Sequence, residues 1–107
     1  MRKIIAYKGY FSKFMAALNE DERRKVRKTM LLLSSDETMP RHYVKPLEEA
    51  IYELRVTLPT KEARVFFIYD GETLVVLFNA FVKKTRKTPH AELEKAKRLK
   101  KEYYESK

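Results

Sequence analysis

Residues 51–83 have the sequence IYELRVTLPTKEARVFFIYDGETLVVLFNAFVK, and this stretch decides the fold. Apolar and polar side chains alternate over 51–58, which is typical of a strand with one mostly polar face. The segments 63–69 and 73–83 are almost continuously apolar, so both faces of each should be covered, as in central strands. Asp70-Gly71 between them is a strong signal for a two-residue hairpin turn. The stretch therefore predicts three antiparallel strands in a meander.

Upstream of the meander, the sequence predicts one short strand and two helices. The strand is expected over residues 2–8, where β-favouring side chains predominate. Apolar residues recur at spacings of three and four over 11–18, as on one face of a helix. Asn19, followed three residues later by Glu22, has the pattern of a capping box and predicts the start of a second helix. Residues 34–47 are polar and contain two prolines, so a loop is expected there.

Downstream of the meander, Thr88 as the cap and Pro89 at the first helical position predict a final helix with basic flanks. The expected order is β-α-α-β-β-β-α. This order predicts the α+β class: a small antiparallel β-sheet with an N-terminal helical hairpin and a basic C-terminal helix. The 107 residues suit a single domain, 1–107.

Composition excludes several classes of protein. The chain has no cysteine, so it has no disulfide framework and no thiol nucleophile. Two glycines are too few for a glycine-rich nucleotide-binding loop. The two histidines, His42 and His90, lack the neighbours of a metal site, and no metal or small-molecule cofactor is expected. No apolar segment is long enough to span a bilayer or to serve as a secretory signal, so we expect a cytoplasmic protein without membrane partners.

Positive charge is concentrated in one fifth of the chain. The formal net charge is +9, and residues 83–101 contain nine Lys or Arg against two Glu. A second basic run, 23–28, follows three acidic residues and is typical of a solvated helix face. The basic segment predicts an anionic partner, which could be a nucleic acid, an anionic lipid surface or an acidic protein.

The predicted sheet brings two cations, Arg64 and Lys83, to one face. With a two-residue turn at Asp70-Gly71, Arg64 would pair with Leu77 and share a face with Asn79, Phe81 and Lys83. Arg55 lies on the polar face of its own strand. Guanidinium and ammonium groups gathered in this way suit phosphoryl chemistry on RNA, because they clamp the scissile phosphate and stabilise developing charge without a metal.

Two alternatives stay open for these side chains. Arg55 and Arg64 could instead form ion pairs with acidic neighbours on the ladder, which are Glu53, Glu62 and Glu72. The run after the last strand could be a solvated basic loop, or a surface that follows an RNA backbone and stacks its bases. In the second case the RNA-binding residues would be Lys45, Phe81, Arg86, Lys87 and His90.

Several of these motifs together resemble a known superfamily. They are Tyr52-Glu53-Leu54-Arg55, Ala63-Arg64-Val65-Phe66-Phe67 and Phe81-Val82-Lys83-Lys84-Thr85-Arg86-Lys87-Thr88-Pro89, followed by Glu92, Ala96 and Arg98. This pattern, over about residues 47–103, is similar to the RelE/ParE superfamily and within it to HigB-type toxins of bacterial type II toxin-antitoxin systems. The first 45 residues match only in the order of strands and helices.

The resemblance implies a metal-independent endoribonuclease that cuts mRNA on the ribosome and is neutralised by an antitoxin, commonly a helix-turn-helix protein. By position, Arg55 and Arg64 would bind the scissile phosphate, and Lys84, with Lys83 beside it, would stabilise or protonate the leaving 5′-oxygen. RelE-type toxins have a lysine where this chain has Glu53, which leaves Glu53 and His90 as alternative general bases. Because Arg64 is expected near a strand edge, Arg64→Ala should abolish toxicity without unfolding the domain.

Two other functions remain possible at this point. A ParE-like protein of the same fold would poison DNA gyrase by binding it, without catalysis. A plain RNA- or DNA-binding module would use the basic helix to follow phosphates.

Overall fold

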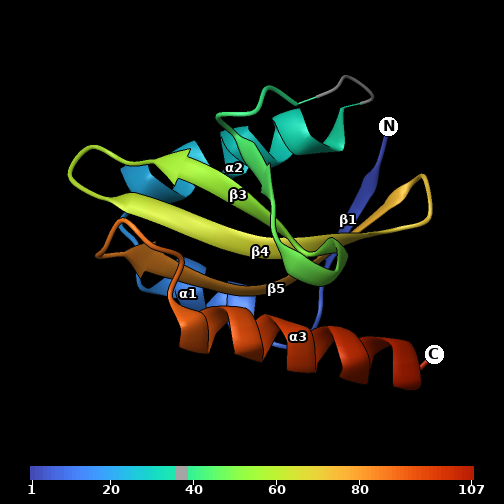
Figure 1. Ribbon diagram of the computed structural model, residues 1–107. Helices are drawn as coiled ribbons and strands as arrows, with labels where there is room; N and C mark the ends of the chain where they lie inside the picture. Colours follow the sequence, from blue (N-terminus) through green and yellow to red (C-terminus); the bar gives the residue numbers. More distant parts are fainter. Residues whose placement is uncertain (36–38) are drawn as a thin grey trace.

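The computed structural model describes residues 1–35 and 39–107 and places helices on both faces of one β-sheet (Figure 1). The strands are β1 (Lys3–Ala6), β2 (Val44–Pro46), β3 (Tyr52–Thr57), β4 (Glu62–Asp70) and β5 (Leu74–Lys83). The helices are α1 (Tyr10–Ala16), α2 (Glu20–Ser34) and α3 (His90–Glu105), with a 3₁₀ turn, η1 (Glu48–Ala50). This arrangement confirms the α+β class and the predicted β3-β4-β5 meander.

The sheet differs from the prediction at both edges. Its order is β1-β5-β4-β3-β2, and β1 runs parallel to β5, so the sheet is mixed rather than antiparallel throughout. The short strand β2 lies in a segment predicted to be a loop, and it pairs with β3. Pro46 is compatible with β2 because β2 is an edge strand, where a missing N–H breaks no ladder. A three-residue strand containing proline carries too little pattern to be recognised from sequence.

The hairpin between β4 and β5 also differs from the predicted two-residue turn. Its loop has three residues, 71–73, and begins at Gly71 with a φ of 77°. Farther along, two residues of β5, Phe78 and Asn79, lie opposite Phe66 alone, which makes a β-bulge. Arg64 consequently pairs with Phe81 and not with Leu77 as predicted. The partner of Arg64 thus lies an even number of residues farther along β5 than predicted, and an even shift keeps side chains on the same face. The predicted common face of Arg64, Phe81 and Lys83 is therefore confirmed.

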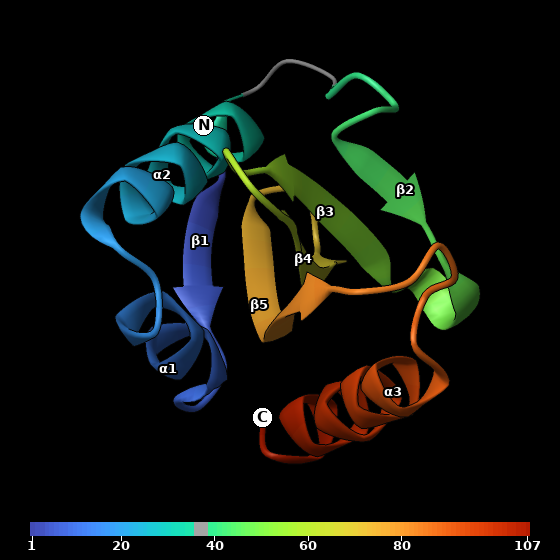
Figure 2. The same cartoon turned by 90° about the vertical axis from the view of Figure 1, so that its left-hand side faces the viewer.

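Two apolar cores lie on the two sides of the sheet. Leu54, Val65 and Phe67 face the helical hairpin, where Val26 and Leu33 of α2 are buried. On the opposite face, α3 packs against the sheet (Figure 2). That second core includes Phe66, Ile68, Val76, Phe78, Ala96, Leu99 and Tyr103. No helix in the described part of the chain is long and apolar enough to cross a membrane.

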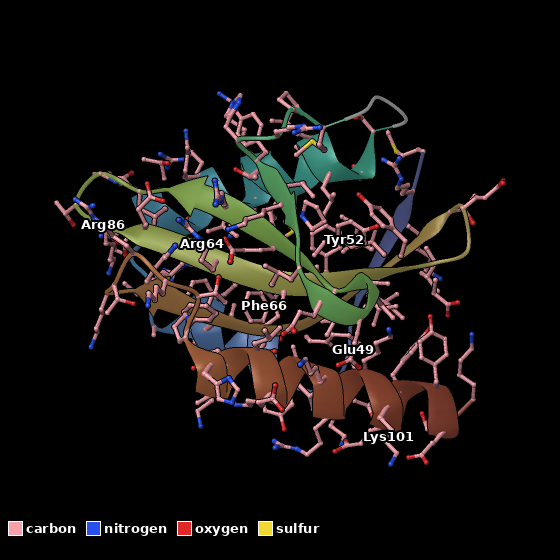
Figure 3. The ribbon with its side chains drawn as sticks, in the orientation of Figure 1. Glu49, Tyr52, Arg64, Phe66, Arg86 and Lys101 are labelled. Carbon is pink, nitrogen blue, oxygen red and sulfur yellow. The ribbon has the colours of Figure 1, made fainter. Side chains whose placement is uncertain are left out.

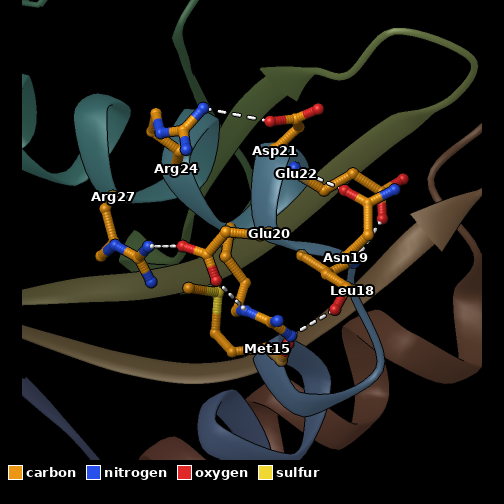
Figure 4. Close-up of polar contacts among 9 residues, drawn as sticks. Met15, Leu18, Asn19, Glu20, Asp21, Glu22, Arg24 and Arg27 are labelled. Atoms are coloured by element: carbon orange, nitrogen blue, oxygen red, sulfur yellow. Dashed lines mark hydrogen bonds and ion pairs between the residues drawn. The ribbon is translucent and has the colours of Figure 1, made fainter.

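The two predicted helix starts have different outcomes. The capping box of α2 is confirmed: Asn19 Oδ1 accepts from the Glu22 backbone N–H at 2.8 Å, and the Asn19 backbone N–H donates to Glu22 Oε1 at 2.8 Å (Figure 4). The predicted cap of α3 is wrong, because Pro89 occupies the cap position and the Thr88 hydroxyl bonds elsewhere. That hydroxyl donates to Glu53 of β3, which draws the loop before α3 toward the sheet.

Candidate functional site

Charged side chains gather where β3, β4 and β5 meet the loop before α3. We call Arg55, Arg64 and Lys83, together with the carboxylate of Glu53, the cationic cluster. Glu53 and Arg55 share a face of β3 because they are two residues apart. Arg55 pairs with Arg64 across the ladder, and Lys83 follows two residues after the partner of Arg64. By this register the cluster lies on the same side of the sheet as Phe66 and α3. Arg64 and Phe66 of β4 are labelled in Figure 3.

Glu53 is the buried centre of this cluster. Its side chain is 1% exposed. One carboxylate oxygen, Oε1, lies 3.0 Å from Arg64 Nε and 3.3 Å from Arg55 Nε. The other, Oε2, accepts a hydrogen bond from Thr88 Oγ1 at 3.1 Å. Both oxygens are therefore engaged, which makes Glu53 an anchor for two arginines and a loop and a poor general base.

The ion pairs that the sequence left open are present for both arginines. Arg64 Nη1 also bonds to Glu62 Oε2 at 2.7 Å and to the Ala63 carbonyl at 3.0 Å. The Arg64 Nε–H is not aligned for a hydrogen bond despite its short distance to Glu53, so this contact is an ion pair only. Glu72, the third predicted partner, forms no ion pair with either arginine in the described part of the chain.

Arg55 and Arg64 differ in their accessibility. The Arg64 side chain is 7% exposed and lies on a central strand. The prediction that Arg64 is an edge residue is therefore wrong, because β4 is covered by β3 and β5 on its two sides. The Arg55 side chain is 31% exposed and uses Nε for Glu53. Arg55 is thus the arginine whose terminal nitrogens can reach a ligand in solvent.

An open depression of ≈ 510 Å³ adjoins the cluster. It is lined by Glu62, Arg64, Lys83, Lys84, Thr85 and Arg86. Within the described residues, Lys83, Lys84 and Arg86 form no ion pair with a carboxylate, so cations outnumber acids here. Burial, and next the nearby Arg64 guanidinium, lower the pKa of Lys83. A lysine with a lowered pKa releases its proton more readily, which suits it to act as an acid.

The other predicted RNA-binding residues lie in different surroundings, and not all of them are near the depression. Lys45 of β2 pairs with Glu53 across the ladder, and its positive charge contributes to the lowered pKa of Lys83. Phe81 packs edge-on against Phe66 with ring centroids 5.2 Å apart, so it belongs in part to the core. Lys87 and His90 are exposed, and neither lines the depression. Among the residues described, no group of three or more His, Asp or Glu could hold a metal ion.

Two threonines of the site were missed by sequence reasoning. Thr85 lines the depression and its hydroxyl donates to the Lys87 carbonyl at 3.0 Å, which shapes the loop locally. Thr88 was predicted to cap α3 and instead ties the loop to Glu53. A threonine before a proline can either cap a helix or bond to a distant acceptor. The position of the buried Glu53 carboxylate, which the sequence does not reveal, decides between these two roles.

Comparison with known proteins places this arrangement in a family. No curated protein matches the chain. The model of the family described as phage-derived protein Gp49-like (DUF891) matches residues 13–101, which include the whole cationic cluster and the loop before α3. The chain therefore belongs to the Gp49-like family, a RelE-like family of toxins that pair with antitoxins in type II toxin-antitoxin systems.

Proposed function

We propose that this chain, residues 1–107 as one domain, is a HigB-like toxin that cleaves mRNA on the ribosome without a metal ion. The observation that supports the proposal is the cationic cluster beside the depression lined by Lys83, Lys84 and Arg86. Membership of a toxin family favours RNA as the anionic ligand. The regularly spaced phosphates of an RNA strand also suit a row of cations that have no acidic partners.

In the proposed reaction the RNA supplies its own nucleophile. The 2′-oxygen attacks the adjacent phosphorus, and the bond from phosphorus to the 5′-oxygen of the next nucleotide breaks. The products are a 2′,3′-cyclic phosphate and a 5′-hydroxyl end. Arg55 binds a non-bridging phosphate oxygen through its terminal nitrogens. Arg64, which is buried beside Arg55, adds positive charge without contacting the phosphate. Lys83, with its lowered pKa, or Lys84 donates the proton to the leaving 5′-oxygen.

The proton of the 2′-hydroxyl goes to a group other than Glu53. Glu53 is buried, and both of its oxygens are held by Arg55, Arg64 and Thr88. His90, exposed at the start of α3, is the titratable candidate that the sequence offers in its place. In this proposal Glu53 acts as a positioning residue for the two arginines.

The test uses the purified protein with ribosomes stalled on a defined mRNA. We expect cleavage with 5′-hydroxyl ends within the codon in the decoding site, mapped by primer extension. Arg55→Ala should lower the single-turnover rate by roughly 10²-fold or more, because a charged group that stabilises the transition state is lost. The charge-matched control is Arg24→Ala on the exposed face of α2, which should cleave at the wild-type rate. Intact mRNA, or equal rates for the two variants, would contradict the proposal.

The ion pairs of the cluster favour a second candidate, a gyrase poison of the ParE type without catalysis. Both strand arginines already have carboxylate partners, as in a structural network that stabilises a binding surface. Expression of the toxin would then leave mRNA intact and produce gyrase-linked DNA breaks. Measuring both products in the same arrested cells distinguishes the two functions.

A further inference from the structure

The edge strand β2 brings further side chains to the face of the cationic cluster (Figure 2). Val44 pairs with Leu54, and one position farther along the ladder the Arg55 backbone N–H donates to the Tyr43 carbonyl at 2.7 Å. Tyr43 therefore lies opposite Arg55. Val44 packs against the core on the α2 side of the sheet. Alternation then directs Tyr43 and Lys45, on either side of Val44, to the face of the cluster.

Tyr43 stands at one end of a row of side chains that crosses the sheet. Arg55 of β3 lies opposite Arg64 of β4, and Arg64 lies opposite Phe81 of β5. Adjacent strands are about 4.8 Å apart, so the row extends over about 14 Å. It places the two arginines between two aromatic rings, with Lys83 beyond the second ring on β5.

The Tyr43 ring belongs to neither apolar core. Five of the seven tyrosines lie in a core or pack against one, and the exceptions are Tyr43 and Tyr104. Tyr43 is partly exposed, and its ring contacts the exposed His42 ring at 4.3 Å between centroids, tilted by 40°. No second aromatic ring contacts Tyr43 among the described residues. Its aromatic surface beside Arg55 is therefore not accounted for by packing of the fold.

The charges around this ring are positive and available. Arg41 and Lys45 are exposed, and neither forms an ion pair with any residue that the structure describes. Arg55 uses Nε for Glu53, which leaves its terminal nitrogens for a ligand. An exposed aromatic ring among cations, next to an arginine that can hold a phosphate, is the combination that binds a nucleotide of a single strand.

We infer that Tyr43 stacks on the base of the nucleotide whose 2′-oxygen attacks, immediately on the 5′ side of the scissile phosphate held by Arg55. The inference rests on the proposed cleavage of RNA. It adds a positioning residue to that site and fixes the direction in which the RNA strand crosses the sheet.

The direction follows from the place of the proposed acid. Lys83 and Lys84 lie at the end of β5, two strands away from Arg55 and on the side opposite to Tyr43. The leaving 5′-oxygen is therefore on the β5 side of the phosphorus. Attacking and leaving oxygens are in line in such a displacement, so the attacking 2′-oxygen and its base lie toward β2. The 3′ side of the strand then follows the depression that Lys84 and Arg86 line.

The first test detects stacking without cleavage. The chain has no tryptophan, so Tyr43→Trp carries a single indole, and Tyr104→Trp on exposed α3 is the matched control. The probe is a 2′-O-methyl RNA hexamer, which has no free 2′-hydroxyl to attack. We expect it to quench the fluorescence of Tyr43→Trp and not that of Tyr104→Trp. A hexamer of the same charge with abasic sites throughout should quench neither.

Affinity for the same hexamer gives a second reading. Tyr43→Leu should bind about tenfold more weakly than wild type, because base–aromatic stacking is lost. Tyr43→Phe keeps the ring and should bind as wild type does, and so should Tyr104→Leu. Absence of quenching in Tyr43→Trp, or equal affinities of Tyr43→Leu and wild type, would overturn the inference.

The direction is tested on ribosomes stalled on a defined mRNA. Tyr43→Leu should cleave intact mRNA about tenfold more slowly than wild type. An abasic nucleotide on the 5′ side of the scissile bond should remove this difference, and one on the 3′ side should preserve it. The reverse pattern, or equal cleavage of intact mRNA by both proteins, overturns the inference and leaves the nuclease standing. Intact mRNA together with quenching in Tyr43→Trp overturns the nuclease, while binding of a base at Tyr43 stands.

Discussion

Arg64 and Arg55 both contact Glu53, yet their removal should have different consequences for stability. Arg64 is buried, and its loss leaves the Glu53 carboxylate in the interior with one arginine partner fewer. We expect Arg64→Ala to lower the free energy of unfolding by about 2–3 kcal/mol. Arg55 is partly exposed and its pair is solvated on one side, so Arg55→Ala should cost about 1 kcal/mol or less.

Urea unfolding of the two variants and of wild-type protein measures this difference. A shift of the midpoint without a change in the m-value would assign the effect to the folded state. Arg24→Ala, at an exposed pair on α2, should unfold with the wild type. Equal stability of Arg64→Ala and wild type would show that the buried pair with Glu53 is not a source of stability. Loss of toxicity in Arg64→Ala cells is therefore a poor test of catalysis, and Arg55→Ala is the better one.

Residue patterns in the sequence predicted which charged side chains lie close together, and they did not predict the burial or the ion-pair partners of these side chains. The period of two placed Arg55 on the polar face of its strand, and the hairpin placed Arg64 with Lys83. Burial of Glu53 depends on the loop that covers it, which is set by a contact across 35 positions of sequence. Nothing local to Glu53 or Thr88 indicates that contact.

At the scale of elements, one side-chain bond in the described part of the chain holds the loop between β5 and α3 to the sheet. Thr88 Oγ1 donates to Glu53 Oε2, and the basic residues 83–87 precede it. Thr88→Val removes the bond and keeps the shape of the side chain. We expect a loss of about 1 kcal/mol in stability, faster amide exchange over 84–88, and weaker RNA binding.

The control for the loop is Thr85→Val, which removes a bond within the loop itself, to the Lys87 carbonyl. Thr88→Ser, which keeps the hydroxyl, should restore the exchange rates of 84–88 and the RNA affinity. If Thr85→Val and Thr88→Val change exchange and affinity equally, the bond to Glu53 has no special part in holding the loop.

A second contact between elements joins the end of α3 to the β4–β5 hairpin. The Tyr103 hydroxyl donates to Asp70 Oδ2 at 2.6 Å, and this bond raises the pKa of Tyr103 to about 12. A group whose pKa is higher in the folded state stabilises the fold below its unfolded pKa, here 10.0, and loses that contribution as pH rises toward 12. The difference in urea midpoint between wild type and Tyr103→Phe should therefore be constant up to pH 10 and shrink above it. A difference that stays constant up to pH 12 would contradict this assignment.

Elements with a periodic hydrophobic pattern were predicted from the sequence, and features without such a pattern were not. The meander and the helices were predicted from periodicity and caps, with ends within a few residues of those observed. The parallel pairing of β1 with β5 depends on packing of the whole sheet, because β1 has no turn that joins it to its partner. The bulge at Phe78 and Asn79 could not be predicted from the sequence either, because a continuously apolar strand has no alternating pattern that would show a change of register.

At the scale of the whole molecule, the basic residues of 83–101 differ in whether the fold gives them acidic partners. In α3, Lys97 lies near three carboxylates, those of Glu48, Glu49 and Glu94. The cations of the loop before α3 have no such partners in the described chain. The sequence predicts the anionic-ligand surface at the strand arginines and residues 83–87, and the basic helix only for a plain nucleic-acid-binding module. Within the described residues, cations without an ion pair lie in both segments: Lys83, Lys84 and Arg86 precede α3, and Lys95 and Lys101 belong to it.

The excess of positive charge should make the fold less stable in acid. Added salt should then stabilise the fold at acidic pH. Cations or backbone N–H groups in contact with Glu20, Glu22, Glu62, Asp70 and Glu102 lower the pKa values of these carboxyls. A carboxyl with a lowered folded pKa stabilises the fold above its unfolded pKa, near 4, and that stability is lost as pH falls through the folded value.

We therefore expect the melting temperature to be nearly constant from pH 6 to pH 8 and to fall steeply below about pH 4.5. Protonation also leaves the 24 Lys and Arg residues uncompensated, so repulsion adds to the loss. Adding 0.5 M NaCl should raise the melting temperature at pH 3.5, because screening weakens this repulsion, and should raise it less at pH 7, where the same salt also weakens the ion pairs. Calorimetry at both pH values, with and without salt, checks the prediction. A melting temperature unchanged between pH 7 and pH 3.5 would mean that the paired carboxylates do not stabilise the fold.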